Sequence, residues 1–197
     1  MYKRSRNLYL FLLIFLSAGL YLIGNARVAL WDRDEPRYAM ASRWMLKSGD
    51  WVVPHIGWGI NPTEPRTAKP PLVYWLQASA MHFLGPTVFA ARLPSSIAMA
   101  LTLALLAVIL ARSFPEHAFW TVLILASSAL FIIAAKMCII DSILLFWVTL
   151  CQICLYLMWR GKSSWPVVII FAISMGLGGL AKGPIILGVS ITTLLVL

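Results

Sequence analysis

The most conspicuous polar cluster in the sequence is an acidic group beside an apolar run. Asp32, Asp34 and Glu35 fall within four positions, and Arg37 follows Asp34 by three residues. Asp34 or Glu35 could act as a general base or bind a divalent metal, and Arg37 lies one helical turn from Asp34, where it can face the same ligand. Acidic residues also favour the positive end of a helix dipole. On the residues alone, a catalytic cluster and a capped helix start both remain open.

Two further positions carry charge where apolar segments begin. Lys69 precedes a Pro-Pro pair, where its ammonium group could neutralise a lipid phosphate. The alternative is an ordinary lysine that extends to the membrane surface. Asp141 separates two apolar runs, and an ionisable residue at a membrane boundary is a functional candidate. The alternative is an N-cap for a helix that begins at Ser142.

The composition is that of a membrane protein. Of the 197 residues, 61% are hydrophobic and 12% are charged, whereas soluble domains are about 45–50% apolar and about 25% charged. These values exclude a disordered chain, a disulfide-rich secreted module and a typical cytosolic globule. The net charge of +9 is spread between apolar runs, so membrane lipids, rather than nucleic acid, are the expected anionic partners.

Two short motifs are set aside. Cys151 and Cys154 form a C-x-x-C without a second pair or a nearby histidine, which favours buried thiols over redox or metal chemistry. Gly176-x-Gly178-x-x-Ala181 matches a dinucleotide fingerprint, but it lies in an apolar run with no preceding strand. Small residues there favour close helix packing. Lys182, which follows, could be a functional cation or a lysine that extends from a helix end to the membrane surface, and the second interpretation is favoured.

Six apolar runs predict an all-α, polytopic transmembrane helix bundle. The predicted spans are 8–26, 88–111, 118–135, 142–159, 165–180 and an incomplete 185–197. The first run follows Lys3, Arg4 and Arg6 and could be a signal peptide, but it lacks a clear cleavage site and is interpreted as an uncleaved span. Basic residues in the short loops predict a cytoplasmic N-terminus and an outward-facing loop over 27–87.

This outward loop must position most of the candidate residues. Apolar spacing predicts an amphipathic helix over 36–48 and a second helix over 72–84, both too short to span and suited to the membrane interface. Five prolines between 54 and 71 predict irregular structure there. Loops on a rigid scaffold carry function disproportionately, so the site is expected in this loop.

The order of these pieces resembles the GT-C superfamily of integral-membrane glycosyltransferases. The similarity is to the bacterial branch with 4-amino-4-deoxy-L-arabinose lipid A transferase and related protein mannosyltransferases. The matching segments are 34–39 (DEPRYA), 48–55 (SGDWVVPH), 69–75 (KPPLVYW), 91–95 (ARLPS), 141–142 (DS) and 180–184 (LAKGP). The resemblance covers residues 8–197. Since these enzymes are more than twice as long, the chain is expected to be an N-terminal portion of a transmembrane glycosyltransferase domain.

The resemblance implies transfer of a sugar from a polyprenyl-phosphate carrier to lipid A, a glycan or a protein. The reaction would be a direct displacement with inversion at the periplasmic face of the bacterial inner membrane. The implied site residues fall into three groups: catalytic Asp34, Glu35 and Asp141; lipid-phosphate-binding Arg37 and Lys69; and cavity-lining Tyr38, Tyr74 and His55. Many relatives carry an acidic, potentially metal-binding residue before this lysine. Here that residue is Ala68, which leaves a divalent-metal requirement open.

The alternative is a non-catalytic membrane protein, such as a transporter fragment or a lipid-binding subunit. A transporter is expected to place ionisable residues near the midplane and to show internal repeats. Here the ionisable residues stand at the ends of the apolar runs and in one loop, which favours the transferase.

Overall fold

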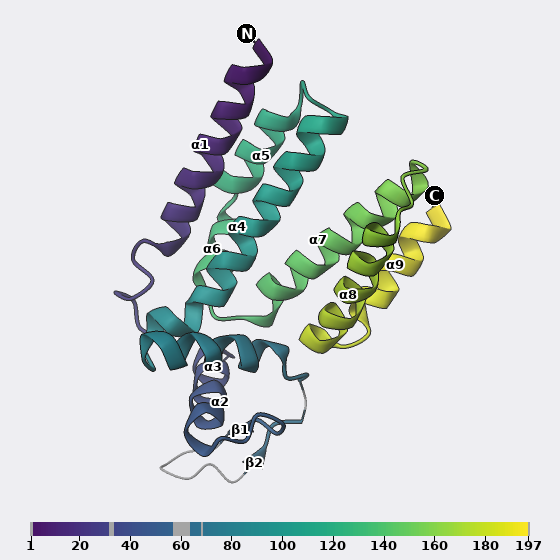
Figure 1. Cartoon of the computed structure of the whole chain (residues 1–197). Helices are drawn as coiled ribbons and strands as arrows, with labels where there is room; N and C mark the ends of the chain where they lie inside the picture. Colours follow the sequence, from purple (N-terminus) through teal and green to yellow (C-terminus); the bar gives the residue numbers. More distant parts are fainter. Residues whose placement is uncertain (1, 32–33, 57–63, 68, 197) are drawn as a thin grey trace.

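The computed structural model describes residues 2–31, 34–56, 64–67 and 69–196, and it confirms the predicted helical bundle. Long apolar helices run side by side, and two shorter helices lie at one end of them (Figure 1). The long helices are α1 (Tyr2–Leu22), α4 (Val88–Ser113), α7 (Ile140–Trp159) and α8 (Trp165–Lys182), and α9 (Ile185–Val196) follows α8 as a shorter apolar helix. The N-terminus and the α4–α5 connection lie at the end opposite to the two shorter helices.

Among the described residues, three helices are long and apolar enough to cross a membrane: α4, α7 and α8. The chain is therefore a multi-pass membrane protein. The apolar stretches Asn7–Leu22 and Ile185–Val196 are shorter, so crossing by α1 and α9 stays a prediction.

The span predicted over 118–135 is divided into two helices in the structure. Helices α5 (Ala118–Ser127) and α6 (Ala129–Lys136) meet at an angle of 61° and can together form one broken span. Ser128 between them has an extended backbone (φ −62°, ψ 129°). The Ser127 hydroxyl donates to the Leu123 carbonyl oxygen at 2.8 Å, the type of side-chain contact that competes with helical hydrogen bonds and bends helices.

Helix α7 begins two residues earlier than predicted. Its N-cap is Ile139, and Asp141 lies inside the first turn. The N-cap interpretation of Asp141 is therefore wrong. At this place its carboxylate still faces the positive end of the helix dipole, and its oxygens remain available to another element.

The outward loop folds into a small layer of its own. Helix α2 (Asp34–Ser48) begins two residues before the predicted start, and α3 (Leu72–Leu84) has the predicted bounds. Their apolar faces bury Tyr38 and Met45 against Tyr74 and Ala78, and Ser42 donates to the Gln77 side-chain oxygen at 2.8 Å. Two short strands, β1 (His55–Ile56) and β2 (Glu64–Pro65), pair antiparallel where only irregular structure was predicted.

Small residues and thiols serve packing, as the sequence predicts. Gly178 of α8 lies against the side chains of Ile186 and Trp147. The three cysteines are unpaired and buried. One apolar core lies under the α2–α3 layer and reaches the start of α7 and the end of α8. The site therefore lies on a packed apolar core to which α2, α3, α4, α7 and α8 all contribute.

Candidate active site

A cavity of about 460 Å³ opens where α2, the α6–α7 connection and the end of α8 meet. It is lined by Asp34, Arg37, Tyr38, Ile56, Arg66, Lys69, Ile139, Ile140, Asp141 and Lys182. Five of the eight site residues predicted from the sequence therefore come together in one cavity. They reach it from the start of α2, the segment before α3 and the first turn of α7.

The cavity lining carries four cations and two carboxylates, a net charge of +2. Arg37 faces Asp34 at 3.9 Å between Nη1 and Oδ1, and Lys182 is ion-paired with Asp141. The Asp34 and Asp141 side chains are 56% and 59% exposed. Ion pairs this exposed are weak, so both carboxylates remain accessible to a substrate.

Lys182 was interpreted from the sequence as a lysine that extends from a helix end to the membrane surface. In the structure its ammonium group instead pairs with Asp141 inside the cavity. The available signal was topological, because both residues stand at ends of apolar runs that the predicted topology places on the same side.

Arg66 is a cavity residue that the sequence interpretation missed. Its guanidinium carbon lies 4.7 Å from the ring centroid of Tyr38 and 5.9 Å from that of Tyr74. The two rings pack at 5.8 Å. The Arg66 backbone N–H donates to the Pro54 carbonyl oxygen at 2.6 Å, which fixes the segment. No described carboxylate pairs with Arg66 or with Lys69.

Tyr74, predicted to line the cavity, is fully buried and absent from the lining. It packs behind Tyr38, which does line the cavity. Burial raises the pKa of Tyr74 to about 12 and also raises the pKa of Tyr38, and the charge of Arg66 opposes both shifts. Both phenols are therefore neutral at physiological pH. They offer Arg66 a neutral aromatic surface, which leaves its charge for a ligand.

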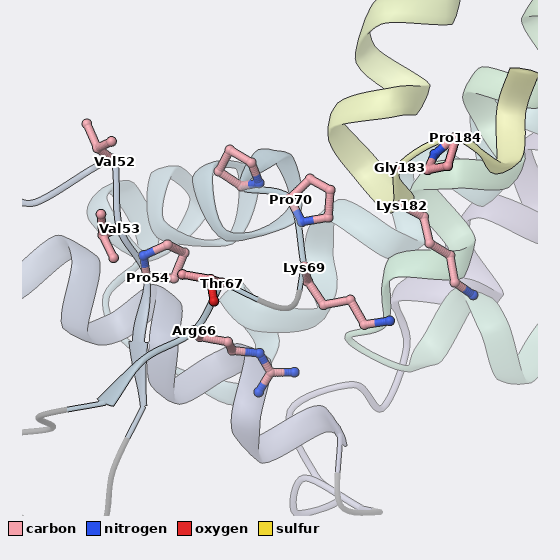
Figure 2. Close-up of a pocket in the computed structure, with 11 residues that line it drawn as sticks. Val52, Val53, Pro54, Arg66, Thr67, Lys69, Pro70, Lys182, Gly183 and Pro184 are labelled. Carbon is pink, nitrogen blue, oxygen red and sulfur yellow. The ribbon is translucent and has the colours of Figure 1, made fainter.

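A second cavity, of about 490 Å³, shares three of these cations (Figure 2). Arg66, Lys69 and Lys182 line both cavities, and the remaining residues around the second are mostly apolar or proline. Figure 2 shows Lys69 in the segment before α3 and Lys182 at the end of α8. The three cations thus lie at the boundary between a cavity that also contains carboxylates and a cavity whose other lining residues are largely apolar.

Local hydrogen bonds hold the wall of the second cavity. Asp50 Oδ1 accepts from the backbone N–H groups of Val52 and Val53 at 3.0 and 3.1 Å. These hydrogen bonds lower the pKa of the Asp50 carboxyl. The Trp75 indole N–H donates to the Trp51 carbonyl oxygen at 2.6 Å and ties this turn to α3.

Besides Tyr74, two more residues predicted for the site, His55 and Glu35, do not line either cavity. The His55 ring donates from Nδ1 to the Val53 carbonyl oxygen at 2.9 Å, so it stabilises the turn before β1. Glu35 is fully buried and ion-paired with Arg92. Glu35 was expected to be catalytic. A carboxylate that is buried and fully hydrogen-bonded cannot reach a substrate, so the structure places Glu35 outside the candidate site.

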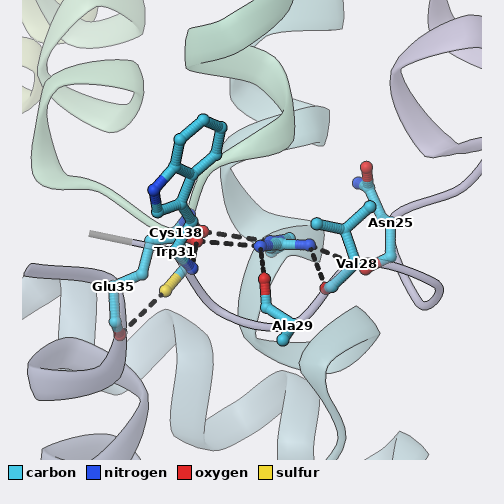
Figure 3. A network of polar contacts seen from close by, with 7 residues as sticks. Asn25, Val28, Ala29, Trp31, Glu35 and Cys138 are labelled. Atoms are coloured by element: carbon cyan, nitrogen blue, oxygen red, sulfur yellow. Dashed lines mark hydrogen bonds and ion pairs between the residues drawn. The ribbon is translucent and has the colours of Figure 1, made fainter.

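The electrostatics of Glu35 follow from its partners (Figure 3). Burial alone would raise the pKa of its carboxyl. Hydrogen bonds from Arg92 and from the N–H groups of Cys138 and Trp31 outweigh burial, and the pKa lies below its ordinary value. Glu35 is therefore ionised at neutral pH.

The described residues do not offer a metal-ligand set. No group of three or more His, Cys, Asp or Glu side chains among them could hold a metal ion. The cavity supplies only Asp34 and Asp141, each already facing a cation. Ala68, at the position where the resemblance implies an acidic residue, lies outside the described residues.

Comparison with known proteins decides the family. Residues 7–197 match the profile of the dolichyl-phosphate-mannose-protein mannosyltransferase family. The chain belongs to this family. It is 32% identical over 190 residues to undecaprenyl phosphate-alpha-4-amino-4-deoxy-L-arabinose arabinosyl transferase of Yersinia enterocolitica, an alignment that covers 93% of this chain and 33% of that protein. It is 34% identical over 178 residues to the enzyme of the same name from Pseudomonas aeruginosa, covering 87% and 31%.

The fold has the same relatives. A crystal structure of ArnT from Cupriavidus metallidurans bound to undecaprenyl phosphate superposes with a TM-score of 0.79 at 22% identity, covering 90% of this chain and 33% of that one. The apo form gives a TM-score of 0.78 at 21% identity and covers 92% and 34%. The predicted GT-C fold is confirmed. The chain spans about a third of the length of the curated relatives that it matches.

Proposed function

We propose that the protein of which this chain is a part transfers a sugar from a polyprenyl-phosphate carrier to an acceptor at the periplasmic face of a bacterial inner membrane. The observation that carries the proposal is the cavity with a net charge of +2 at one end of an apolar helix bundle. The printed names of the relatives favour undecaprenyl phosphate as the carrier and 4-amino-4-deoxy-L-arabinose as the sugar. Lipid A, a glycan and a protein are the acceptor classes considered.

The cations account for binding of the carrier phosphate. The phosphodiester of the donor carries one negative charge, and the phosphate monoester that leaves gains another. Arg37 and Lys69 would hold this phosphate, and the adjoining apolar surface would take the first part of the polyprenyl chain. Cations fixed where charge develops stabilise the transition state more than the ground state.

The carboxylates account for the acceptor side of the reaction. An acceptor oxygen forms a bond to the anomeric carbon while the bond from that carbon to the phosphate oxygen breaks, and the phosphate leaves with the electron pair. A hydroxyl acceptor would give its proton to Asp34. An acceptor phosphate is already ionised, and Asp34 would then orient it. Asp141, held by Lys182, would line the same space.

The alternative, a non-catalytic transporter fragment or lipid-binding subunit, lacks a comparable observation. The charged residues gather in a cavity at the end of the bundle rather than at its midplane. Membership of a mannosyltransferase family also favours a transferase.

The test is mass spectrometry of lipid A and of envelope glycans and proteins from cells with and without the gene. The proposal expects one sugar modification to disappear on deletion and to return with the full-length gene. Full-length Lys47→Ala, which removes an exposed cation outside both cavities, should restore it equally. Identical profiles with and without the gene would contradict the proposal.

A further inference from the structure

The buried ion pair between Glu35 and Arg92 lies next to the cavity without lining it. Arg92 of α4 donates from Nε to Glu35 Oε1 at 3.0 Å and from Nη2 to Oε2 at 2.8 Å. The Arg92 side chain is 5% exposed and the Glu35 side chain is 0% exposed. A bidentate, charge-assisted contact of this kind is both strong and geometrically specific.

The remaining donors of Arg92 fix the segment between α1 and α2. Arg92 donates to three carbonyl oxygens of this segment at 2.9–3.1 Å, those of Asn25, Val28 and Ala29 (Figure 3). The backbone N–H of Trp31 donates to Glu35 Oε2 at 2.7 Å. Arg92 and Glu35 therefore each bind backbone groups of the segment that leads to α2. Asp34, the first residue of α2, is the immediate neighbour of Glu35.

The same carboxylate also fixes the segment that leads to Asp141. Glu35 Oε1 accepts from the backbone N–H of Cys138 at 2.7 Å, and the Cys138 thiol donates to the Glu35 carbonyl oxygen at 3.3 Å. The next turn of α4 adds a second attachment, since Ser96 donates to the Ala135 carbonyl oxygen at 2.7 Å. Only Ile139 and Ile140 lie between Cys138 and Asp141, so little chain is free to move between the network and the cavity.

We propose that Glu35 and Arg92 are positioning residues that set the separation of Asp34 and Asp141. This inference rests on the proposed transferase function. One carboxylate contacts both segments that present the cavity acids, so a change in the pair moves one acid relative to the other. Displacements of about 1 Å can cost about a hundredfold in rate. The buried pair is not easily replaced, because removal of one partner leaves an uncompensated charge.

The test is steady-state kinetics of the full-length protein in membranes, normalised to the amount of inserted protein. Glu35→Gln keeps the shape but loses the charge, and one of its terminal atoms becomes an N–H donor that faces other donors. We expect kcat to fall about tenfold or more. The KM for the lipid donor should stay within about twofold, because Lys69 lies on a segment outside the network and the long, exposed side chain of Arg37 can follow a small displacement of α2. Thr102→Val is the matched control, since it removes another buried hydrogen bond of α4 and should leave kcat unchanged.

Arg92→Lys provides the second variant, since it keeps the charge but not the planar fork that reaches the three carbonyl oxygens. We expect the same fall in kcat at constant KM. If Glu35→Gln is not inserted into the membrane, Arg92→Lys alone tests the inference. Wild-type kcat per inserted molecule, with only the yield reduced, would overturn the inference. A rise in KM alone would also overturn it. The proposed function fails separately, if Asp34→Asn retains full activity.

Discussion

At the scale of single residues, the four cations of the cavity differ in what holds them. Arg37 and Lys182 each face a carboxylate, whereas no described carboxylate pairs with Lys69 or Arg66. An unpaired cation can bind a phosphate without first giving up a partner. Lys69 and Arg66 are therefore the residues whose charge is most available to an anionic substrate.

Replacement of Lys69 by methionine should lower kcat/KM for the lipid donor about tenfold or more. A hydrogen bond to a charged group contributes about 1.5–3 kcal/mol, and about 1.4 kcal/mol corresponds to a factor of ten. The measurement is transfer by the full-length enzyme at varied donor concentration. Lys47→Met, an exposed lysine of α2 that packs over the Trp44 ring, is the control and should be unchanged. Equal values for both variants would contradict the assignment of Lys69.

The lowered pKa of Glu35 predicts a pH dependence of stability. Because its folded pKa lies below the unfolded value of about 4.3, the ion pair stabilises the protein above that value. The stabilisation disappears as pH falls through the lower, folded pKa. The melting temperatures of the wild type and Glu35→Gln should therefore differ at pH 7 and converge in acid. Thermal unfolding in detergent from pH 7 to well below about pH 4.3 checks this, and a difference that stays constant below that value would contradict it.

At the scale of elements, the sequence predicted helices best where their ends are marked. Helix α3 has the predicted bounds because Pro71 precedes it and Gly85, with a φ of 78°, ends it. The break between α5 and α6 was missed because no proline or glycine stands there, and the serine pair at 127–128 is a weak signal. The pairing of β1 with β2 was missed because prolines obscure the strand pattern and the pairing joins segments apart in sequence.

The packing of α8 against α9 gives a prediction at this scale. A methyl group at Gly178 would overlap the Ile186 side chain, whereas a methyl group at Gly176 would meet nothing within 4 Å. Gly178→Ala should destabilise the protein by about 1–3 kcal/mol, and Ile186→Val in the same chain should recover part of the loss. Thermal unfolding measures both, with Gly176→Ala as control. The packing account is wrong if the two alanine variants melt alike.

At the scale of the whole molecule, the charged cavity and the basic connections between helices lie at opposite ends of the bundle. The cavity lies at the end with α2 and α3, whereas the α4–α5 and α7–α8 connections lie at the other (Figure 1). These connections follow or contain Arg112, Arg160 and Lys162. By the positive-inside rule, we predict that the cavity faces the periplasm.

Cysteine labelling tests this topology, because the native cysteines of the described chain are buried. Glu64 of β2 and Lys162 after α7 are both exposed and lie at opposite ends. A membrane-impermeant maleimide added to cells with a permeabilised outer membrane should label full-length Glu64→Cys and not Lys162→Cys. Both should react once the inner membrane is opened. The reverse pattern in intact inner membranes would place the site on the cytoplasmic side.

The site as a whole was predictable in part. Asp34, Arg37, Lys69 and Asp141 stood out because charge beside apolar runs is conspicuous, and they share one cavity. Glu35 could not be separated from its neighbour Asp34, because its burial depends on an arginine 57 positions away. For the same reason Arg66 was missed and Lys182 was interpreted as an ordinary lysine at a helix end, since their partners come from distant segments.

The most direct test of the account is transfer by full-length Asp34→Asn in a membrane assay with a polyprenyl-phosphate-linked sugar. Asparagine keeps the size of the side chain but removes the charge that would accept a proton or orient the acceptor. The account predicts that transfer falls by about a hundredfold or more, with the variant inserted at the wild-type level. Undiminished transfer to lipid and protein acceptors would contradict it.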